Sequence, residues 1–115
     1  MAYNIPAHTK GDTFLSPIFE VIVNGTAVDL DEYSIKMQVR RYAVKTSPVV
    51  IEFSKTDGTM EVVGASTDGK FKIKEAVVDI PANTYKYDIE FTKISTEKVR
   101  TWIKGEWQIT EEVTQ

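Results

Sequence analysis

The sequence feature that most constrains the fold is a strict alternation of apolar and charged residues late in the chain. From Tyr85 to Phe91, every odd position is apolar or aromatic and every even position is charged. Side chains on a pleated strand return to the same face every second residue, so this period of two predicts a strand with one buried and one solvated face. One-sided strands of this kind are typical of antiparallel sheets.

Other segments show the same alternation or a denser apolar run, and each predicts a further strand. These segments are Ile18–Val23, Ile35–Arg40, Val49–Phe53, Phe71–Lys74 and Gly105–Thr110. Three pairs that tolerate positive φ lie between them and predict tight turns: Asn24-Gly25, Asp57-Gly58 and Asp68-Gly69. Because no segment is long enough for a crossover helix, we expect an antiparallel sandwich or barrel. The one helical turn expected is at Pro81–Thr84, where proline pre-sets φ.

Length and pattern predict one domain preceded by an arm. A chain of 115 residues fits a single domain. Residues 1–10 show no period, so we expect them to form an N-terminal arm, free or docked on a neighbour, and residues 11–115 to form the β-sandwich domain. Ile5 and Pro6 are the interface candidates on this arm.

Charge and residue counts exclude several classes of function. A net charge of -3 leaves no basic excess for phosphates or anionic lipids, so neither nucleic acid nor a membrane is an expected partner. The chain has no cysteine and one histidine, His8, which we interpret as a surface or interface residue. Asp29, Asp31 and Glu32 lack an EF-hand pattern and are interpreted as a solvated turn. We therefore expect no enzyme activity, no metal and no cofactor.

Trp102 is the aromatic residue most relevant to binding. In the segment 98–103, alternation places Trp102 on the face that carries Lys98 and Arg100, and an exposed tryptophan beside cations is a typical interface anchor. Two alternatives stay open: both faces are covered here, or a bulge near Gly105 shifts the register. Tyr85, Tyr87 and Trp107 alternate with the apolar set and are expected in the core.

A basic loop is expected between two of the strands. Residues 40–48 include Arg40, Arg41 and Tyr42 in an otherwise acidic chain. Either the loop docks on an acidic partner surface by electrostatic complementarity, or it is simply solvated.

The order of the motifs resembles that of small structural domains of tailed bacteriophages, including the immunoglobulin-like N-terminal module of baseplate upper proteins. The motifs that carry the resemblance run from Gly11 to Val113, and no single one is specific. They are Gly11–Phe14, Phe19–Val23, Asn24-Gly25, Val28–Leu30, Ile35–Arg40, Phe53–Thr59, Phe71–Ile73, Ile80–Ala82, Tyr85–Ile89 and Gly105–Ile109.

The resemblance implies an all-β, antiparallel, immunoglobulin-like β-sandwich with at most one short helical turn. It also implies a virion structural protein, made in the host bacterial cytoplasm, that works through assembly contacts in the capsid, neck, tail or baseplate. The partners would be other virion proteins, with a homo-oligomer as a possibility. Baseplate proteins usually continue into further domains, so a decoration or adaptor role is also implied. The alternative is a carbohydrate-binding module that recognises a host surface glycan through exposed aromatic rings.

Overall fold

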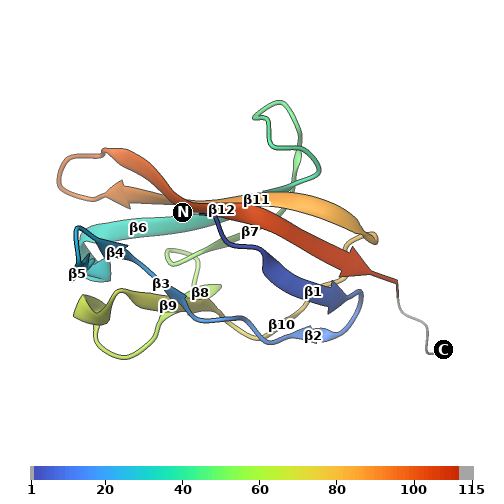
Figure 1. Ribbon diagram of the computed structural model, residues 1–115, viewed down its shortest axis with the longest axis horizontal. Helices are drawn as coiled ribbons and strands as arrows, with labels where there is room; N and C mark the ends of the chain where they lie inside the picture. The colour runs from blue at the N-terminus through green and yellow to red at the C-terminus, as the bar shows by residue number, and fades with distance from the viewer. Residues whose placement is uncertain (1, 112–115) are drawn as a thin grey trace.

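Two β-sheets pack face to face in the computed structural model of the protein, which describes residues 2–111 (Figure 1). A five-stranded sheet has the order β1-β12-β11-β6-β7, and a three-stranded sheet has the order β3-β9-β8. Two small antiparallel pairs, β2 with β10 and β4 with β5, extend the second layer. The prediction of an all-β sandwich is confirmed.

The elements follow one another in the order in which they are numbered. Their bounds are β1 Ile5–Thr9, β2 Thr13–Phe14, β3 Phe19–Glu20, β4 Ile22–Val23, β5 Thr26–Ala27, η1 Leu30–Glu32, β6 Tyr33–Arg40, β7 Val49–Ser54, β8 Met60–Val62, η2 Ser66–Asp68, β9 Lys70–Ile73, β10 Ala76–Val77, β11 Asn83–Lys93 and β12 Val99–Thr110. All six segments predicted as strands carry strand structure, although the region 18–23 is divided into two short strands. The expected end of the domain, residues 112–115, lies outside the described residues.

The strand order is that of an immunoglobulin sandwich. The run β12-β11-β6-β7 corresponds to strands G-F-C-C′ of such a domain, and β3-β9-β8 corresponds to B-E-D. Tyr85, near the start of β11, donates a hydrogen bond from its hydroxyl to the carbonyl oxygen of Pro81 at 2.6 Å. A tyrosine near the start of strand F that bonds back to upstream backbone is the tyrosine corner of this fold class. The corner fixes the entry of the chain into the central strand.

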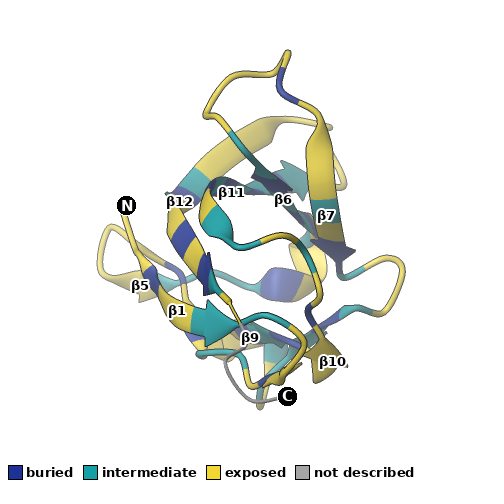
Figure 2. Ribbon diagram, turned by 90° about the vertical axis from the view of Figure 1, so that its right-hand side faces the viewer, coloured by how far each residue is buried: buried dark blue, intermediate teal, exposed yellow. Residues whose placement is uncertain are grey.

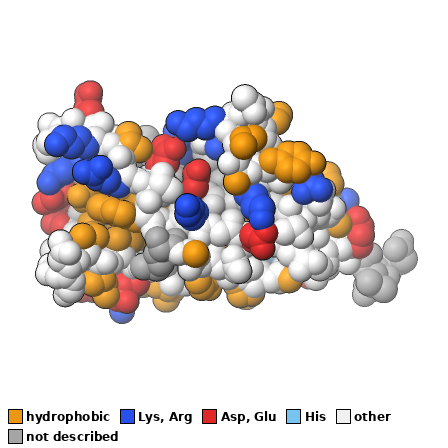
Figure 3. Space-filling view, turned by 45° about the horizontal axis from the view of Figure 1, so that its top comes forward, with side chains coloured by type: hydrophobic (Ala, Val, Ile, Leu, Met, Phe, Trp, Pro, Cys, Tyr) orange, Lys and Arg blue, Asp and Glu red, His pale blue; other side chains and the backbone are white. Residues whose placement is uncertain are grey.

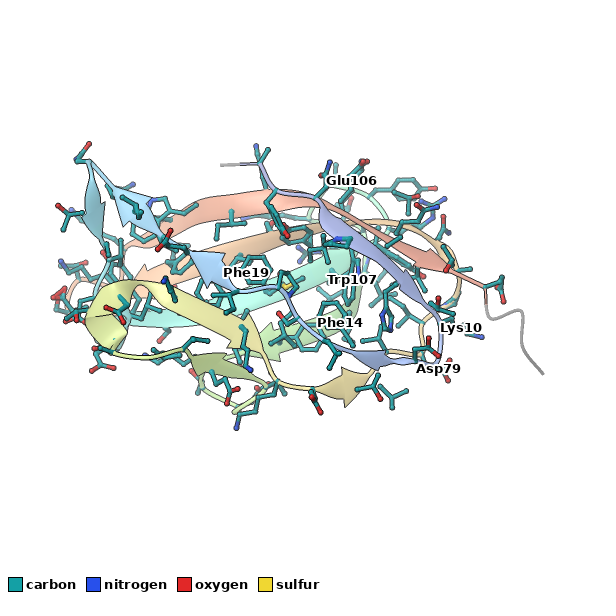
Figure 4. The ribbon with its side chains drawn as sticks, turned by 60° about the horizontal axis from the view of Figure 1, so that its bottom comes forward. Lys10, Phe14, Phe19, Asp79, Glu106 and Trp107 are labelled. Carbon is teal, nitrogen blue, oxygen red and sulfur yellow. The ribbon has the colours of Figure 1, made fainter. Side chains whose placement is uncertain are left out.

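Aromatic rings fill the space between the layers. Trp107 on β12 is fully buried and lies 4.7 Å, between ring centroids, from Phe14 on β2, and both point into the interior in Figure 4. Phe19 and Phe71 stack at 5.3 Å in the second sheet, and Phe71 meets Phe91 of the first sheet at 5.7 Å. The odd residues of β11, Tyr85 to Phe91, are buried, which confirms the burial predicted from the alternation.

The expectation of an N-terminal arm is wrong, because residues 5–9 form a strand of the large sheet. β1 pairs in parallel with β12, and Ile5 is only 4% exposed. Ahead of the strand, the Tyr3 N–H donates to the Lys104 carbonyl at 2.9 Å, and the Tyr87 hydroxyl donates to the Tyr3 carbonyl. Gly105 permits this approach, since a Cβ there would lie 1.9 Å from the Tyr3 oxygen. The segment is held by contacts to the far end of the chain, which no local period reveals.

The expected helical turn at Pro81–Thr84 is also wrong. That segment is a bend leading into β11. The two single-turn 3-10 helices lie elsewhere, at Leu30–Glu32 and Ser66–Asp68. In the first, the Asp29 carboxylate accepts a hydrogen bond from the Asp31 N–H at 3.1 Å, which satisfies a donor at the start of the turn.

The three predicted turns are present, with one difference in kind. Asn24 and Gly25 have φ of 52° and 76° and close the β4–β5 hairpin, and Gly58 lies in the tight connection from β7 to β8. Gly69, with φ of 68°, ends the second 3-10 helix instead of closing a hairpin. Its place is also crowded, because a Cβ would lie 2.7 Å from the Val21 carbonyl oxygen.

Candidate functional site

Trp102 packs inward, contrary to the expectation that it is an exposed anchor. Its ring lies 5.0 Å from that of Phe91 and 5.3 Å from that of Tyr33, and the residue is only partly exposed. The pairing of β11 with β12 shifts at this point, from Ile89 opposite Ile103 to Glu90 opposite Thr101. Trp102 is the extra residue of this bulge, so the alternation that would have placed it outward fails here.

Lys98 and Arg100 are exposed, as expected, but not beside an exposed indole. They lie at the β11–β12 hairpin together with the exposed aliphatic side chains of Ile94 and Val99. Of the two arm residues predicted to form an interface, Ile5 is buried in the chain's own core, whereas Pro6 is exposed on the edge strand β1. The prediction for Ile5 is therefore wrong, since a buried side chain cannot meet a partner.

The basic loop between β6 and β7 protrudes from the large sheet, as Figure 2 shows at its upper end. Internal bonds hold its shape. Ser47 is buried, its backbone oxygen accepts from Arg40 Nε at 3.0 Å, and its hydroxyl accepts from the Tyr42 N–H at 3.2 Å. Arg41 donates to the Thr84 carbonyl at 3.1 Å, and its guanidinium lies 5.0 Å above the Tyr42 ring. The loop is therefore preformed, and its exposed tip presents the side chains of Tyr42 and Val44.

A groove of about 630 Å³ lies between this loop and the outer face of the sheet. Its floor comes mainly from the even positions of β6, β11 and β12, whose side chains face away from the core. Figure 4 illustrates this for β12, where Glu106 and Trp107 lie on opposite sides of the strand. The charged lining residues are Arg40, Lys45, Lys86, Asp88, Lys104 and Glu106. Figure 3 shows basic and acidic side chains interspersed over this face of the molecule, with hydrophobic side chains beside them. We call this feature the loop groove.

Asp88 lies in the floor of the loop groove with one oxygen unsatisfied. Its Oδ1 is buried and has no hydrogen-bond partner among residues 2–111. Burial raises the pKa of this carboxyl, and nearby Glu90 adds to the rise, while Arg40, Lys45 and Lys36 oppose it. A buried acceptor with no donor is uncommon in folded proteins and disfavours the charged form of the carboxyl.

The cations of the loop groove outnumber its carboxylates by four to two, although the whole chain has a net charge of -3. Lys86 pairs with Glu106 across β11 and β12. Lys45 and Lys104 take part in none of the ion pairs formed within residues 2–111. The loop groove is therefore a local positive site with two ammonium groups available for an anion.

The outer edge of β7 is a second exposed feature and adjoins the loop. Among residues 2–111, β7 pairs only with β6, and it lies at the edge of the sheet in Figure 2. Its first two residues, Val49 and Val50, are exposed aliphatic side chains and directly follow the loop that carries Tyr42 and Val44. We call these four residues with the free edge of β7 the β7 edge.

The orientation of the backbone along β7 follows from one hydrogen bond. The Lys55 N–H donates to the Ile35 carbonyl of β6. Because the backbone N–H and C=O groups of successive residues point to opposite sides of a strand, those of Phe53 also point toward β6. Those of Glu52 and Ser54 point away from β6. The Ser54 N–H is taken by Thr59 Oγ1 at 2.7 Å. The Glu52 backbone is left facing outward with no partner strand.

The structure therefore brings together only some of the predicted site residues. Arg40, Arg41 and Tyr42 share one loop at the end of β6, whereas Trp102 contacts Tyr33 at the start of β6, about 23 Å away along the strand. Lys45 belongs to the predicted basic loop, whereas sequence reasoning missed Asp88 and Lys104, although the alternation does place Asp88 on the solvated face.

His8 lies outside the lining of the loop groove. His8 donates a hydrogen bond from Nε2 to the Asp12 carbonyl at 2.9 Å and contacts the Phe14 ring. No group of three or more histidine, aspartate or glutamate residues within 2–111 is placed to hold a metal ion. Across the same residues, no helix is long and apolar enough to span a membrane.

Comparison with known proteins gives no relative on which a function could be based. No protein-family model matches the chain, and no curated protein is significantly similar to it in sequence. The geometry of the loop groove and of the β7 edge is therefore the basis for the function proposed next.

Proposed function

We propose that the protein is a structural module of a bacteriophage virion that acts through protein–protein contacts, with the β7 edge as its main contact. The observation that carries the proposal is an open strand edge next to four exposed apolar side chains. An unpaired edge pairs readily with an extended segment of another chain, through backbone hydrogen bonds that need no particular sequence.

The β7 edge lacks the features by which proteins usually protect such an edge. Protected edges carry lysine, proline or inward-pointing charge. Here the exposed residues are Val49 and Val50, with one charge at Glu52. Tyr42, which is 60% exposed, adds a large ring that can anchor a partner at low entropy cost. The combination favours a contact that is covered in an assembly.

The proposal that the partners are virion proteins rests on the order of motifs that resembles phage structural domains. The tyrosine corner of Tyr85 and the strand order are in keeping with the immunoglobulin-like part of that resemblance. No catalytic role is proposed, and the partner would be a neighbouring subunit of the particle.

The carbohydrate-binding alternative has less support. It requires two or more exposed aromatic rings on one concave surface. Within the described part of the chain, the loop groove has one exposed ring, Tyr42, while its other aromatic lining residue, Tyr87, is buried. We therefore favour a protein partner.

Incorporation into particles tests the proposed function. Val50→Lys places a charge on the β7 edge, and Glu52→Pro removes the outward N–H without touching the bonds to β6. Val77→Lys is the matched control, because Val77 is exposed and lies on β10 in the other layer. We expect both edge variants to fold but to be depleted from purified particles, while the control is incorporated normally. Equal incorporation of all three variants would contradict the role of the edge.

A further inference from the structure

The loop groove is distinct from the β7 edge and suggests a more specific kind of recognition. It crosses β6, β11 and β12 on the outer face of the sheet and has a volume within the range of ligand sites. Six of its fourteen lining residues are charged and the others are neutral or apolar, so the groove offers both charged and apolar contacts to a ligand.

The sign of that ligand follows from the charges that remain unpaired. Because Lys86 is engaged with Glu106, the available charges are Lys45, Lys104 and the part of the Arg40 guanidinium that does not bond to Ser47. The only unpaired acid in the lining is Asp88. Complementary electrostatic potentials guide two molecules together and fix how they align, so the positively charged groove fits a negatively charged partner.

The groove also provides two contacts that a simple anion would not use. The carboxyl of Asp88, which lines the groove, can accept a hydrogen bond from a backbone amide, which lies between acidic side chains on an extended peptide. Tyr42 and Val44, at 60% and 55% exposure, line the rim and can cover an apolar side chain. An acidic peptide with interspersed apolar residues matches all three features.

The wall of the groove is prepared before any ligand arrives. The bonds of Ser47 to Arg40 and to the Tyr42 N–H, together with the Arg41 bond to Thr84, fix the loop that carries Lys45. A preformed wall lowers the ordering cost of binding.

We propose that the loop groove binds an acidic, extended segment of a partner protein, with its carboxylates at Lys45 and Lys104 and a backbone N–H at the Asp88 carboxyl. The inference deepens the proposed function by naming the chemistry of one contact, and it rests on that function being protein binding. It can fail while the β7 edge still functions, because the test below uses the isolated protein and defined peptides.

The test uses blocked hexapeptides of alternating glutamate and valine, with the lysine–valine peptide as the comparison. Titration followed by amide chemical shifts should show tighter binding of the acidic peptide by about tenfold, with shifts centred on residues 42–45, 86–88 and 104–106, and weaker binding as salt is added. Preference for the lysine peptide, or shifts outside the groove, would overturn the proposal.

Variants then separate the groove from general electrostatics. Lys45→Glu combined with Lys104→Glu should weaken binding of the acidic peptide by about tenfold or more. Lys74→Glu makes the same kind of change at an exposed lysine outside the groove and should have little effect. An equal loss of peptide affinity with Lys74→Glu would show that only the net charge of the protein matters and would overturn the assignment of the loop groove as the binding site.

A pair of uncharged substitutions isolates the hydrogen bond at Asp88. Asp88→Asn retains an acceptor oxygen and Asp88→Leu does not, while both remove the charge. We expect the leucine variant to bind the acidic peptide about fivefold more weakly than the asparagine variant. Equal affinities of the two variants for the acidic peptide would show that Asp88 is not part of the site. Tighter binding of an oligogalacturonate than of the peptide would assign the groove to an acidic saccharide instead.

Discussion

Replacing Gly105 with alanine tests whether the N-terminal segment is an integral part of the sheet. The added Cβ would lie 1.9 Å from the Tyr3 carbonyl oxygen and 2.7 Å from its carbon, so the backbone at Tyr3 must move away. The movement breaks the bond from the Tyr3 N–H to the Lys104 carbonyl and deprives the buried Tyr87 hydroxyl of its acceptor.

The expected cost follows from these two losses. A typical backbone hydrogen bond contributes about 1 kcal/mol, and leaving a buried hydroxyl unpaired costs about 1–3 kcal/mol. Gly105→Ala should therefore lower the free energy of unfolding by about 2–4 kcal/mol. For a domain of this size the melting temperature would fall by roughly 10 °C, measured by calorimetry, with urea unfolding as the second assay.

A double-mutant cycle with Tyr87→Phe checks the mechanism. If the clash acts through the Tyr87–Tyr3 bond, removing the hydroxyl should destabilise the wild-type protein but cost little or nothing in the Gly105→Ala background. A Gly105→Ala protein within about 0.5 kcal/mol of wild type would refute the docked position of the N-terminal segment, because surface changes usually have effects of that size.

Three further variants test other parts of the structure. Tyr85→Phe removes the tyrosine corner and should cost about 1 kcal/mol in urea unfolding, whereas no change would mean that the bond to Pro81 is unimportant. Trp102→Ala should cost about 3 kcal/mol, because the ring packs on Tyr33 and Phe91; a fully stable variant would instead favour an exposed anchor. Asp88→Asn should raise the melting temperature at neutral pH. The pKa of Asp88 in the folded protein is raised above its usual value of 3.8, so the ionised carboxylate destabilises the fold at pH values above the raised pKa. This destabilisation disappears as the pH falls below 3.8, where the carboxyl is protonated in both the folded and the unfolded protein. A gain that is equal at pH 7 and at pH 3.5 would contradict this cause.

The strands with a strong local pattern were predictable from sequence. In β11 the alternation fixed which side chains enter the core, because one face of that strand is buried along its whole length. The same pattern correctly placed Trp107 in the core on β12. Turns were predictable where glycine follows asparagine or aspartate, since few other residues adopt positive φ.

The errors have a common physical origin in contacts between distant parts of the chain. β1 contains Pro6 and lacks alternation, yet it is held by parallel pairing to β12, about a hundred residues further on. A single extra residue in β12 was enough to turn Trp102 inward. The loop groove combines a loop with three strands, so only Arg40 and Tyr42 of its lining were predicted as site residues, through the charge and ring of the loop.

The central claim, that the protein functions through contacts of its β7 edge in a particle, is tested most directly by photo-cross-linking. A photoreactive phenylalanine analogue at Val50 would be compared with the same residue at Val77, which is exposed on β10. If the proposed virion role is right, purified particles that contain the protein should give a specific covalent adduct between position 50 and a single virion protein, and none at position 77. Absence of the protein from the particles, or equal adducts at both positions, would contradict it.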